Sequence, residues 1–198
     1  MKNLDAKCGW LESEELPSKE FTCYSCGSNI CSDEGYKYIE DIPKEFPYFE
    51  NTLYIYICHK CKAPTHFNKE GKQVPGSLYG ENVLYLPQDV GEVYNEARKC
   101  FSVKAFTSAV LCCRKILMNI SCEKGADEGK KFEYYVNYLN DKGYIPPDGK
   151  EWVDKIRKLG NQATHKLEIK SQEDAELAIN FTSMLLKLIY EFPNLLKV

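Results

Sequence analysis

The chain of 198 residues is long enough for one or two domains, and its hydrophobic content of 43% is ordinary for a globular protein. The formal net charge of −3 and the pI near 5.7 exclude a strong basic field, so any nucleic-acid contact depends on a local patch. No stretch approaches the ~18 consecutive apolar residues of a membrane span, and the N-terminal sequence lacks an apolar signal core. We therefore expect a soluble cytoplasmic protein without membrane association.

The N-terminal part of the chain changes character near residue 20. Residues 1–20 are acidic and carry no hydrophobic periodicity, so we expect an irregular segment that contains Cys8 as a candidate spare thiolate. Residues 21–70 are expected to form a small β module. Within it, residues 51–58 alternate aliphatic and aromatic side chains, which predicts a strand that leads directly into Cys58.

Two cysteine pairs in this module have the spacing of metal ligands, Cys23-x2-Cys26 and Cys58-x2-Cys61. In the absence of a secretory signal, a zinc site together with reduced cysteines is favoured over a disulfide framework. Two such pairs, each associated with a strand, predict a zinc ribbon with one Zn²⁺ bound by the four thiolates. Four cysteine ligands leave no coordination position for water, so the site is expected to be structural.

Alternatives remain for some of these residues. A redox role for either cysteine pair is disfavoured because no βαβ pattern follows it. Cys31, His59 and His66 could replace one of the four ligands or could be polar residues without a metal role. The many aromatic residues of the module could stack bases or fill a thin core, and the absence of interleaved arginine favours the core.

The second half of the chain has helical periodicity. Residues 71–87 contain several glycine and proline residues and are expected to form a linker. From residue 88 the apolar positions recur with a period of 3.6. The helices are expected over residues 89–101, 103–122 and 131–142, around 152–159, and over 171–192. Ser102 is expected to cap the second helix, Ser171 and Asp174 to form a capping box, and Pro193 to end the last helix.

The short connections between these helices predict an antiparallel helical bundle over residues 88–198. The predicted fold class is therefore mainly α, with a small β zinc ribbon at the N-terminus.

Three polar residues of the fourth helix region fall on one stripe, because Arg157, Asn161 and His165 are four residues apart. A cation, an amide and an imidazole in this arrangement could contact a phosphodiester. In a purely structural interpretation, Asn161 bonds backbone, His165 caps the helix, and Arg157 pairs with Glu96 or Asp89.

Four motifs of the second half carry a family resemblance. They are Leu86-Pro87-Gln88-Asp89-Val90, the run from Tyr94 to Ala97, the run from Arg114 to Leu117, and the run from Ile156 to His165. With them, residues 20–198 resemble an uncharacterised bacterial domain family placed within the HEPN superfamily of helical bundles. The resemblance implies a HEPN-like bundle, an N-terminal zinc ribbon and a place beside restriction and phage-defence components.

Many HEPN domains are metal-independent endoribonucleases, often dimers, with an Arg-x4-6-His motif. The resemblance assigns the histidine to His165 and a polar motif position to Asn161. Arg157 departs from the motif because residues 158–164 separate it from His165, one residue too many, while Lys158 has the right spacing. A histidine can act as acid or base in RNA cleavage, and a nearby cation can stabilise the negative charge of the transition state.

Two functional hypotheses follow. The first is a binding or adaptor module for phage defence or nucleic-acid processing, with a homodimer and a defence-system protein as expected partners. The alternative is a metal-independent endoribonuclease that acts on RNA through His165 with Arg157 or Lys158. The imperfect motif and the acidic charge favour the adaptor.

Overall fold

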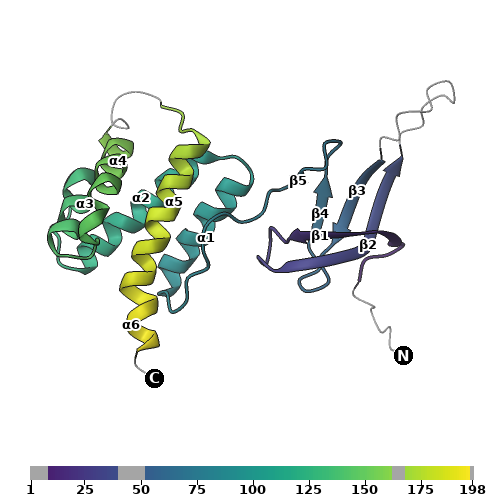
Figure 1. The fold of residues 1–198 in the computed structure, drawn as a ribbon, viewed down its shortest axis with the longest axis horizontal. Coiled ribbons are helices and arrows are strands. Elements are labelled where there is room, and N and C mark those ends of the chain that lie inside the picture. The colour runs from purple at the N-terminus through teal and green to yellow at the C-terminus, as the bar shows by residue number, and fades with distance from the viewer. Residues whose placement is uncertain (1–8, 40–51, 162–167, 197–198) are drawn as a thin grey trace, which may run out of the picture. The chain divides into compact units, whose positions relative to one another are not determined.

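The computed structural model describes residues 9–39, 52–161 and 168–196 of the chain (Figure 1). The chain divides into two compact units, Met1–Ser77 and Leu78–Val198. We call them the sheet unit and the helical unit. Their boundary falls inside the expected linker.

The sheet unit is a five-stranded antiparallel sheet with the strand order β1-β2-β3-β4-β5 (Figure 1). Each strand pairs with the next one along the chain, so the sheet is a simple meander. The strands are β1 (Glu14–Thr22), β2 (Asn29–Ile39), β3 (Thr52–Ile57), β4 (Pro64–Phe67) and β5 (Gln73–Val74).

This sheet corrects the predicted fold class. The chain is 47% helical and 19% strand, so a mainly α protein with a minor β module was the wrong prediction. The expectation of an irregular segment over residues 1–20 was also wrong, because β1 begins at Glu14, and β5 lies inside the expected linker. The glutamates and Pro17 of β1 have low strand propensity, so the local sequence does not predict a strand. The strand forms because it pairs with β2.

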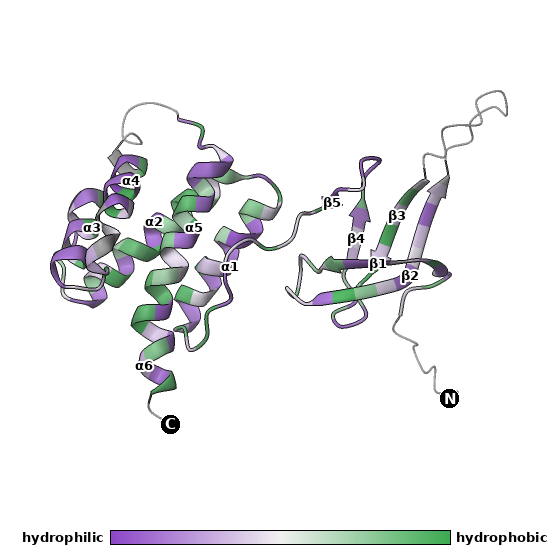
Figure 2. Ribbon diagram, viewed as in Figure 1, coloured by the Kyte–Doolittle hydropathy of each residue, from purple (hydrophilic) through white to green (hydrophobic). Residues whose placement is uncertain are grey.

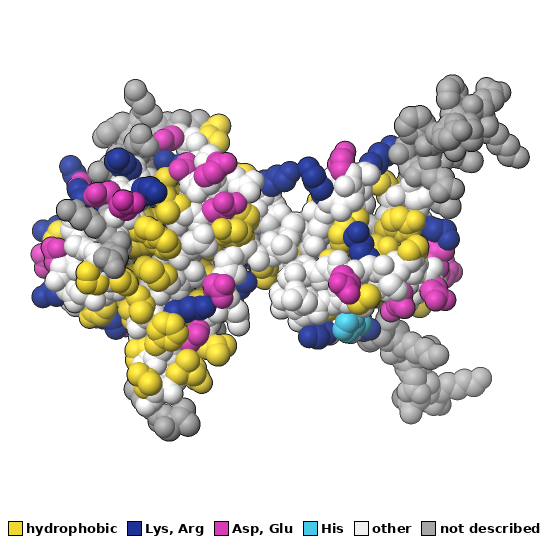
Figure 3. Space-filling model, in the orientation of Figure 1, with side chains coloured by type: hydrophobic (Ala, Val, Ile, Leu, Met, Phe, Trp, Pro, Cys, Tyr) yellow, Lys and Arg dark blue, Asp and Glu magenta, His cyan; other side chains and the backbone are white. Residues whose placement is uncertain are grey.

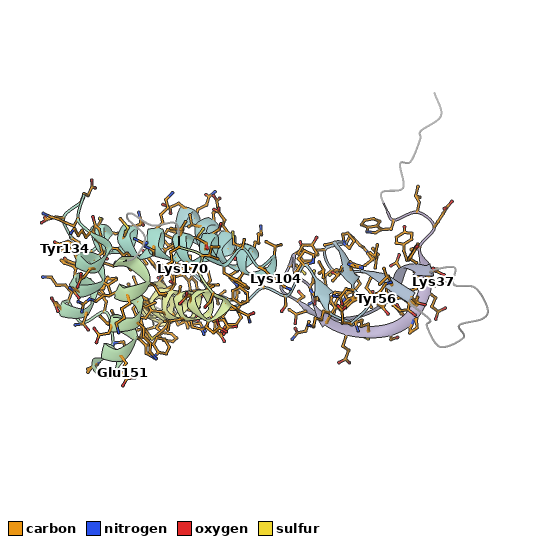
Figure 4. The ribbon with its side chains drawn as sticks, turned by 90° about the horizontal axis from the view of Figure 1, so that it is seen from above. Lys37, Tyr56, Lys104, Tyr134, Glu151 and Lys170 are labelled. Carbon is orange, nitrogen blue, oxygen red and sulfur yellow. The ribbon has the colours of Figure 1, made fainter. Side chains whose placement is uncertain are left out.

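A compact aromatic core lies on one face of the sheet. Leu16, Tyr56 and Phe67 are buried, and Phe21 packs against them from β1. The Tyr56 hydroxyl donates a hydrogen bond of 2.9 Å to the carbonyl oxygen of Pro17, and Figure 4 shows Tyr56 among the side chains enclosed by the strands. These aromatic residues therefore serve as core, because their rings are covered by one another.

The helical unit contains six α-helical segments, a 3₁₀ turn and a π-helical turn within its described residues. They are α1 (Gln88–Ser102), α2 (Phe106–Glu123), α3 (Phe132–Asp141), η1 (Pro147–Gly149), α4 (Lys150–Asn161), α5 (Gln172–Leu186), η2 (Lys187–Glu191) and α6 (Phe192–Leu195). Their apolar faces form one hydrophobic core. Helices α2 and α5 contribute fully buried residues such as Leu117, Ile120, Phe181 and Leu185, and both are largely hydrophobic in Figure 2.

Helix starts show which local predictions were reliable. The capping box at α5 is confirmed, since Ser171 Oγ accepts from the Asp174 amide at 3.2 Å and Asp174 Oδ2 accepts from the Ser171 amide at 3.1 Å. The predicted cap at Ser102 was wrong. Ser102 is the last residue of α1, its hydroxyl donates to the Lys99 carbonyl, and α2 begins only at Phe106.

The last helix continues past the predicted stop at Pro193. A proline lacks the N–H that an α-helix needs for its bond to the residue four positions earlier. The π-helical turn η2 changes the hydrogen-bond register before the proline, and Pro193 then sits in the first turn of α6. The side chains of Phe192, Leu195 and Leu196 are exposed, and hydrophobic side chains gather over α6 in Figure 3.

The segment before α1 is an integral part of the helical unit. We call residues 78–87 the clamp segment. Asn180 Nδ2 of α5 donates to the Tyr79 hydroxyl at 2.9 Å, and Glu191 Oε2 accepts from the Leu84 amide at 2.7 Å. The clamp segment is therefore held at both ends along the C-terminal helices.

Arg98 fixes the same segment from α1. Its side chain is only 7% exposed, and its guanidinium donates to the carbonyl oxygens of Tyr79 at 3.0 Å and Gly80 at 3.1 Å. A third bond of 3.4 Å reaches Asn95 Oδ1. A buried cation needs such partners because desolvation without them is costly.

Candidate metal centre

The two cysteine pairs lie in the tight connections between β1 and β2 and between β3 and β4, and the two connections repeat the same backbone pattern. In the first, the Gly27 amide donates to the Cys23 carbonyl at 2.9 Å. In the second, the Lys62 amide donates to the Cys58 carbonyl at 2.8 Å. The amides of Cys23 and Cys58 in turn donate to the carbonyl five residues further on, at 2.9 and 3.0 Å. Each connection is therefore a tight turn of the same geometry, which we call a knuckle.

Both knuckles need a residue with positive φ directly after the second cysteine. Gly27 fills this position in the first knuckle with φ 68°, as its lack of a side chain allows. Lys62 fills it in the second knuckle with φ 62°, which costs about 1–2 kcal/mol for a residue with a Cβ. The sequence indicates the first turn through its glycine and gives no equivalent signal for the second.

The four sulfur atoms converge. All Sγ atoms of Cys23, Cys26, Cys58 and Cys61 lie within 4.8 Å of one another, with 3.6 Å between Cys23 and Cys61 and 3.8 Å between Cys26 and Cys58. A tetrahedral ion with metal–sulfur bonds of about 2.3 Å places its ligands about 3.8 Å apart. The distances across the knuckles fit this tetrahedron, so the four cysteines could hold a metal ion.

The thiols of the first knuckle differ in acidity. Burial raises the pKa of Cys23 to about 12, although the amides of Cys26 and Ser25 act in the opposite direction by donating to its sulfur. For Cys26, burial also acts to raise the pKa, but hydrogen bonds from the side chain and amide of Ser28 and from the neighbouring thiols lower it to about 6. A bound cation favours the thiolate at every ligand, so it would override this difference.

Other candidate ligands stand apart from this cluster. Among the described residues, the four cysteines are the one group of three or more potential ligands close enough to share an ion. Cys31 is exposed on β2, His59 is exposed in the second knuckle, and His66 lies on β4 opposite Ile55. Cys8 lies outside the described residues.

Trp10 braces the second knuckle. Its indole N–H donates to the Lys62 carbonyl at 2.8 Å, and its ring meets Tyr36 edge to face at 6.2 Å. The Tyr36 hydroxyl donates to the carbonyl of Leu11. Lys62 is the strained residue of that knuckle, so Trp10 helps to hold it in place. A tryptophan inside an otherwise polar segment was the available signal.

The polar stripe of the helical unit is described only in part. His165 lies outside the described residues, and the side chain of Asn161, the last residue of α4, is likewise not described. The Arg157 guanidinium forms an ion pair with Glu133 of α3 and a second one, of 3.2 Å, with Asp154 of α4. The structural interpretation named Glu96 or Asp89 as its partner, and those partners were wrong. Lys158 is exposed.

Comparison with known protein families finds one match, in the second half of the chain. A family model described as a domain of unknown function, DUF4145, matches residues 95–197, more than half of the chain. This chain belongs to the DUF4145 family. It matches no curated protein and no solved structure.

The DUF4145 match begins inside α1 and continues through α6. The sheet unit with its four cysteines and the clamp segment both precede it. Arg157 and Asn161 lie within the DUF4145 region, as does His165. Among the described residues of this DUF4145 protein, no helix combines the length and apolar character required to cross a membrane.

Proposed function

We propose that this chain is a binding or adaptor module in which one structural Zn²⁺ organises the sheet unit and the helical unit engages a partner. The convergence of four cysteine sulfurs carries the proposal. Four thiolates complete a tetrahedral coordination sphere and leave no position at which a substrate or water could be activated. The centre therefore supports folding and not a reaction.

Zinc is the metal that we propose for this site. Tetrahedral sites of four cysteines hold either zinc or iron, and zinc suits a site without a redox task. A small sheet unit gains about 10 kcal/mol or more of folding free energy from such an ion. Cys23 and Cys58 would bind it from the buried side, and Cys26 and Cys61 from the exposed side.

Metal content tests this part of the proposal. Elemental analysis of the purified full chain should find one zinc per chain. Cys58→Ser should lose the zinc, whereas Cys31→Ser should keep it, because Cys31 is an exposed cysteine outside the cluster. A full complement of zinc in Cys58→Ser, or iron in place of zinc, would contradict the assignment.

The biological setting that we propose is bacterial phage defence or nucleic-acid processing, as the resemblance to HEPN-superfamily domains implies, with a homodimer as the working form. The ion pairs of Arg157 support the adaptor over the endoribonuclease, because a guanidinium held by two carboxylates is less available to stabilise a phosphodiester transition state. The net charge of −3 points the same way.

Incubation of zinc-loaded protein with a mixed RNA pool in EDTA separates the two functions. EDTA removes free divalent ions from contaminating nucleases, while a histidine mechanism without metal survives, and zinc retention is measured in parallel. If the chain is an adaptor, wild type and His165→Ala should give the same result, with no RNA cleavage above background. Cleavage that yields 2′,3′-cyclic phosphate ends and disappears in His165→Ala would establish the endoribonuclease instead.

A further inference from the structure

A groove of about 190 Å³ lies between α1 and α2 of the helical unit. Its floor is apolar, formed by Val90, Val93 and Ile116, and its other lining residues are polar. Val90 and Ile116 are 5% and 2% exposed, so they belong at the same time to the hydrophobic core. The groove is therefore a recess over the packed core of the helical unit.

Three polar side chains line this groove at different positions along the helix axes. Asp89 lies in the first turn of α1, while Lys115 and Asn119 lie on α2 one helical turn apart. The connection Val103–Ala105 is short, so the two helices run antiparallel and the start of α1 lies beside the end of α2. Asp89 and Asn119 are consequently at one end, and Lys115 is about 6 Å further along.

These polar groups have almost no partners in the described part of the protein. Asp89 Oδ1 accepts from the Val90 amide at 2.9 Å, and no partner is found for its second oxygen. Lys115 forms no ion pair and the Asn119 amide no hydrogen bond with a described residue. The groove thus presents an acid, an amide and a cation that remain available to a ligand.

We propose that this groove binds a small zwitterion with the size and chemistry of an apolar amino acid. The ligand's ammonium group would bond to the Asp89 carboxylate and to Asn119 Oδ1, and its carboxylate to Lys115 Nζ. Its apolar part would cover Val90, Val93 and Ile116. This site belongs to the helical unit, whereas the candidate metal centre belongs to the sheet unit, and it does not depend on the proposed adaptor function.

Size and charge together select this class of ligand. Pockets for drug-sized molecules measure about 300–1,000 Å³, so a groove of about 190 Å³ suits a smaller molecule. A simple anion would be repelled by the Asp89 carboxylate, and a simple cation would be repelled by the Lys115 ammonium. A molecule with both charges and an apolar chain satisfies both ends of the groove.

Titration of the purified, metal-loaded full chain with L-valine, L-leucine and L-methionine, followed by amide NMR spectra, tests the site. At least one amino acid should shift the amides of residues 89–93 and 115–119 in a saturable manner, with a Kd of about 0.1–1 mM for so few ligand atoms. For the best binder, the amide derivative without a carboxylate and the acid without an ammonium group should each bind at least about tenfold more weakly.

Variants localise the binding. Lys115→Gln and Asp89→Asn should each weaken it about tenfold, because each removes one charge-assisted contact. Lys99→Gln is the matched control, since Lys99 is exposed in the last turn of α1 and does not line the groove. The proposal is overturned if none of the three amino acids gives saturable shifts up to about 50 mM. It is equally overturned if Lys115→Gln binds as tightly as Lys99→Gln.

Discussion

The Arg157 guanidinium on α4 is ion-paired with the Glu133 carboxylate on α3, and it also reaches Asp154 within its own helix. The pair joins two neighbouring helices of the same core. It gives the arginine of the polar stripe a structural role that does not depend on any substrate.

Removal of this pair should loosen α3 from α4. The side chains of Arg157 and Glu133 are 33% and 36% exposed, so solvent screens them and we expect Arg157→Gln to cost about 1 kcal/mol. A double-mutant cycle with Glu133→Gln, measured by urea unfolding, should show a coupling that decreases at high salt. Lys158→Gln is the control and should be nearly neutral. Equal losses in Arg157→Gln and Lys158→Gln would argue against a specific pair.

Metal removal should unfold the sheet unit and leave the helical unit folded, because each unit has a hydrophobic core of its own. Trp10 lies in the first unit and Trp152 in the second, so each reports on one unit. In Trp152→Phe, a strong chelator should shift the Trp10 emission to longer wavelength as the indole leaves the Lys62 carbonyl.

The reciprocal variant, Trp10→Phe, provides the control for that experiment. Its remaining Trp152 emission should be unchanged by the chelator. A change of both tryptophan signals at the same chelator concentration would show that the two units unfold together.

Tyr94 should make the helical unit sensitive to alkali. Its hydroxyl donates to the Glu81 carbonyl at 2.8 Å, and burial raises its pKa to about 12, against about 10 for an exposed tyrosine. Because the folded-state pKa is raised, this stabilisation is fully present below pH ~10 and is lost as the pH rises through ~12. By pH 12 the loss should be about 2 kcal/mol.

Urea unfolding followed by far-UV circular dichroism at pH 9 and pH 12 measures this loss. Tyr94→Phe should start with a lower free energy of unfolding and should lack this part of the alkaline decrease. Tyr38→Phe, at a position that is 60% exposed, should behave as the wild type. An alkaline decrease of the same size in Tyr94→Phe and wild type would contradict the assignment.

Gly80→Ala should destabilise the helical unit through two effects. Gly80 has φ 82°, and a Cβ there would come within 2.5 Å of Ile179 Cγ2. Left-handed strain of about 1–2 kcal/mol and overpacking of about 1–3 kcal/mol predict a total loss of about 2–5 kcal/mol. Gly143→Ala isolates the first effect, because Gly143 has φ 74° and a Cβ there would meet nothing within 4 Å. In thermal unfolding, the Tm of Gly80→Ala should be clearly lower than the Tm of Gly143→Ala.

The cluster of four cysteines was the part of the structure that the sequence predicted best. Its ligands come in two pairs of fixed spacing, and the local turn brings each pair together regardless of what surrounds it. Local signals also sufficed for the capping box of Ser171 and Asp174, which depends only on four successive residues.

Features that depend on distant partners were not accessible. Strand β1 is polar along most of its length, and Leu16 becomes a core residue only when Tyr56 and Phe67 arrive from other strands. The clamp segment resembles a linker in composition, since its bonds to Arg98 use backbone carbonyls that every sequence possesses. In both cases the structure depends on contacts with residues distant in the sequence, which local propensity does not reveal.

The bonding of Arg98 determines which changes the clamp segment tolerates. Its guanidinium is satisfied by the main-chain oxygens of residues 79 and 80, and those oxygens are present whatever side chains stand there. Insertion or deletion of a single residue between the clamp segment and Arg98 would move these oxygens away and leave the buried cation with only its long bond to Asn95 Oδ1. The number of residues between positions 80 and 98 is thus constrained, because the buried Arg98 guanidinium needs these two backbone carbonyls as acceptors.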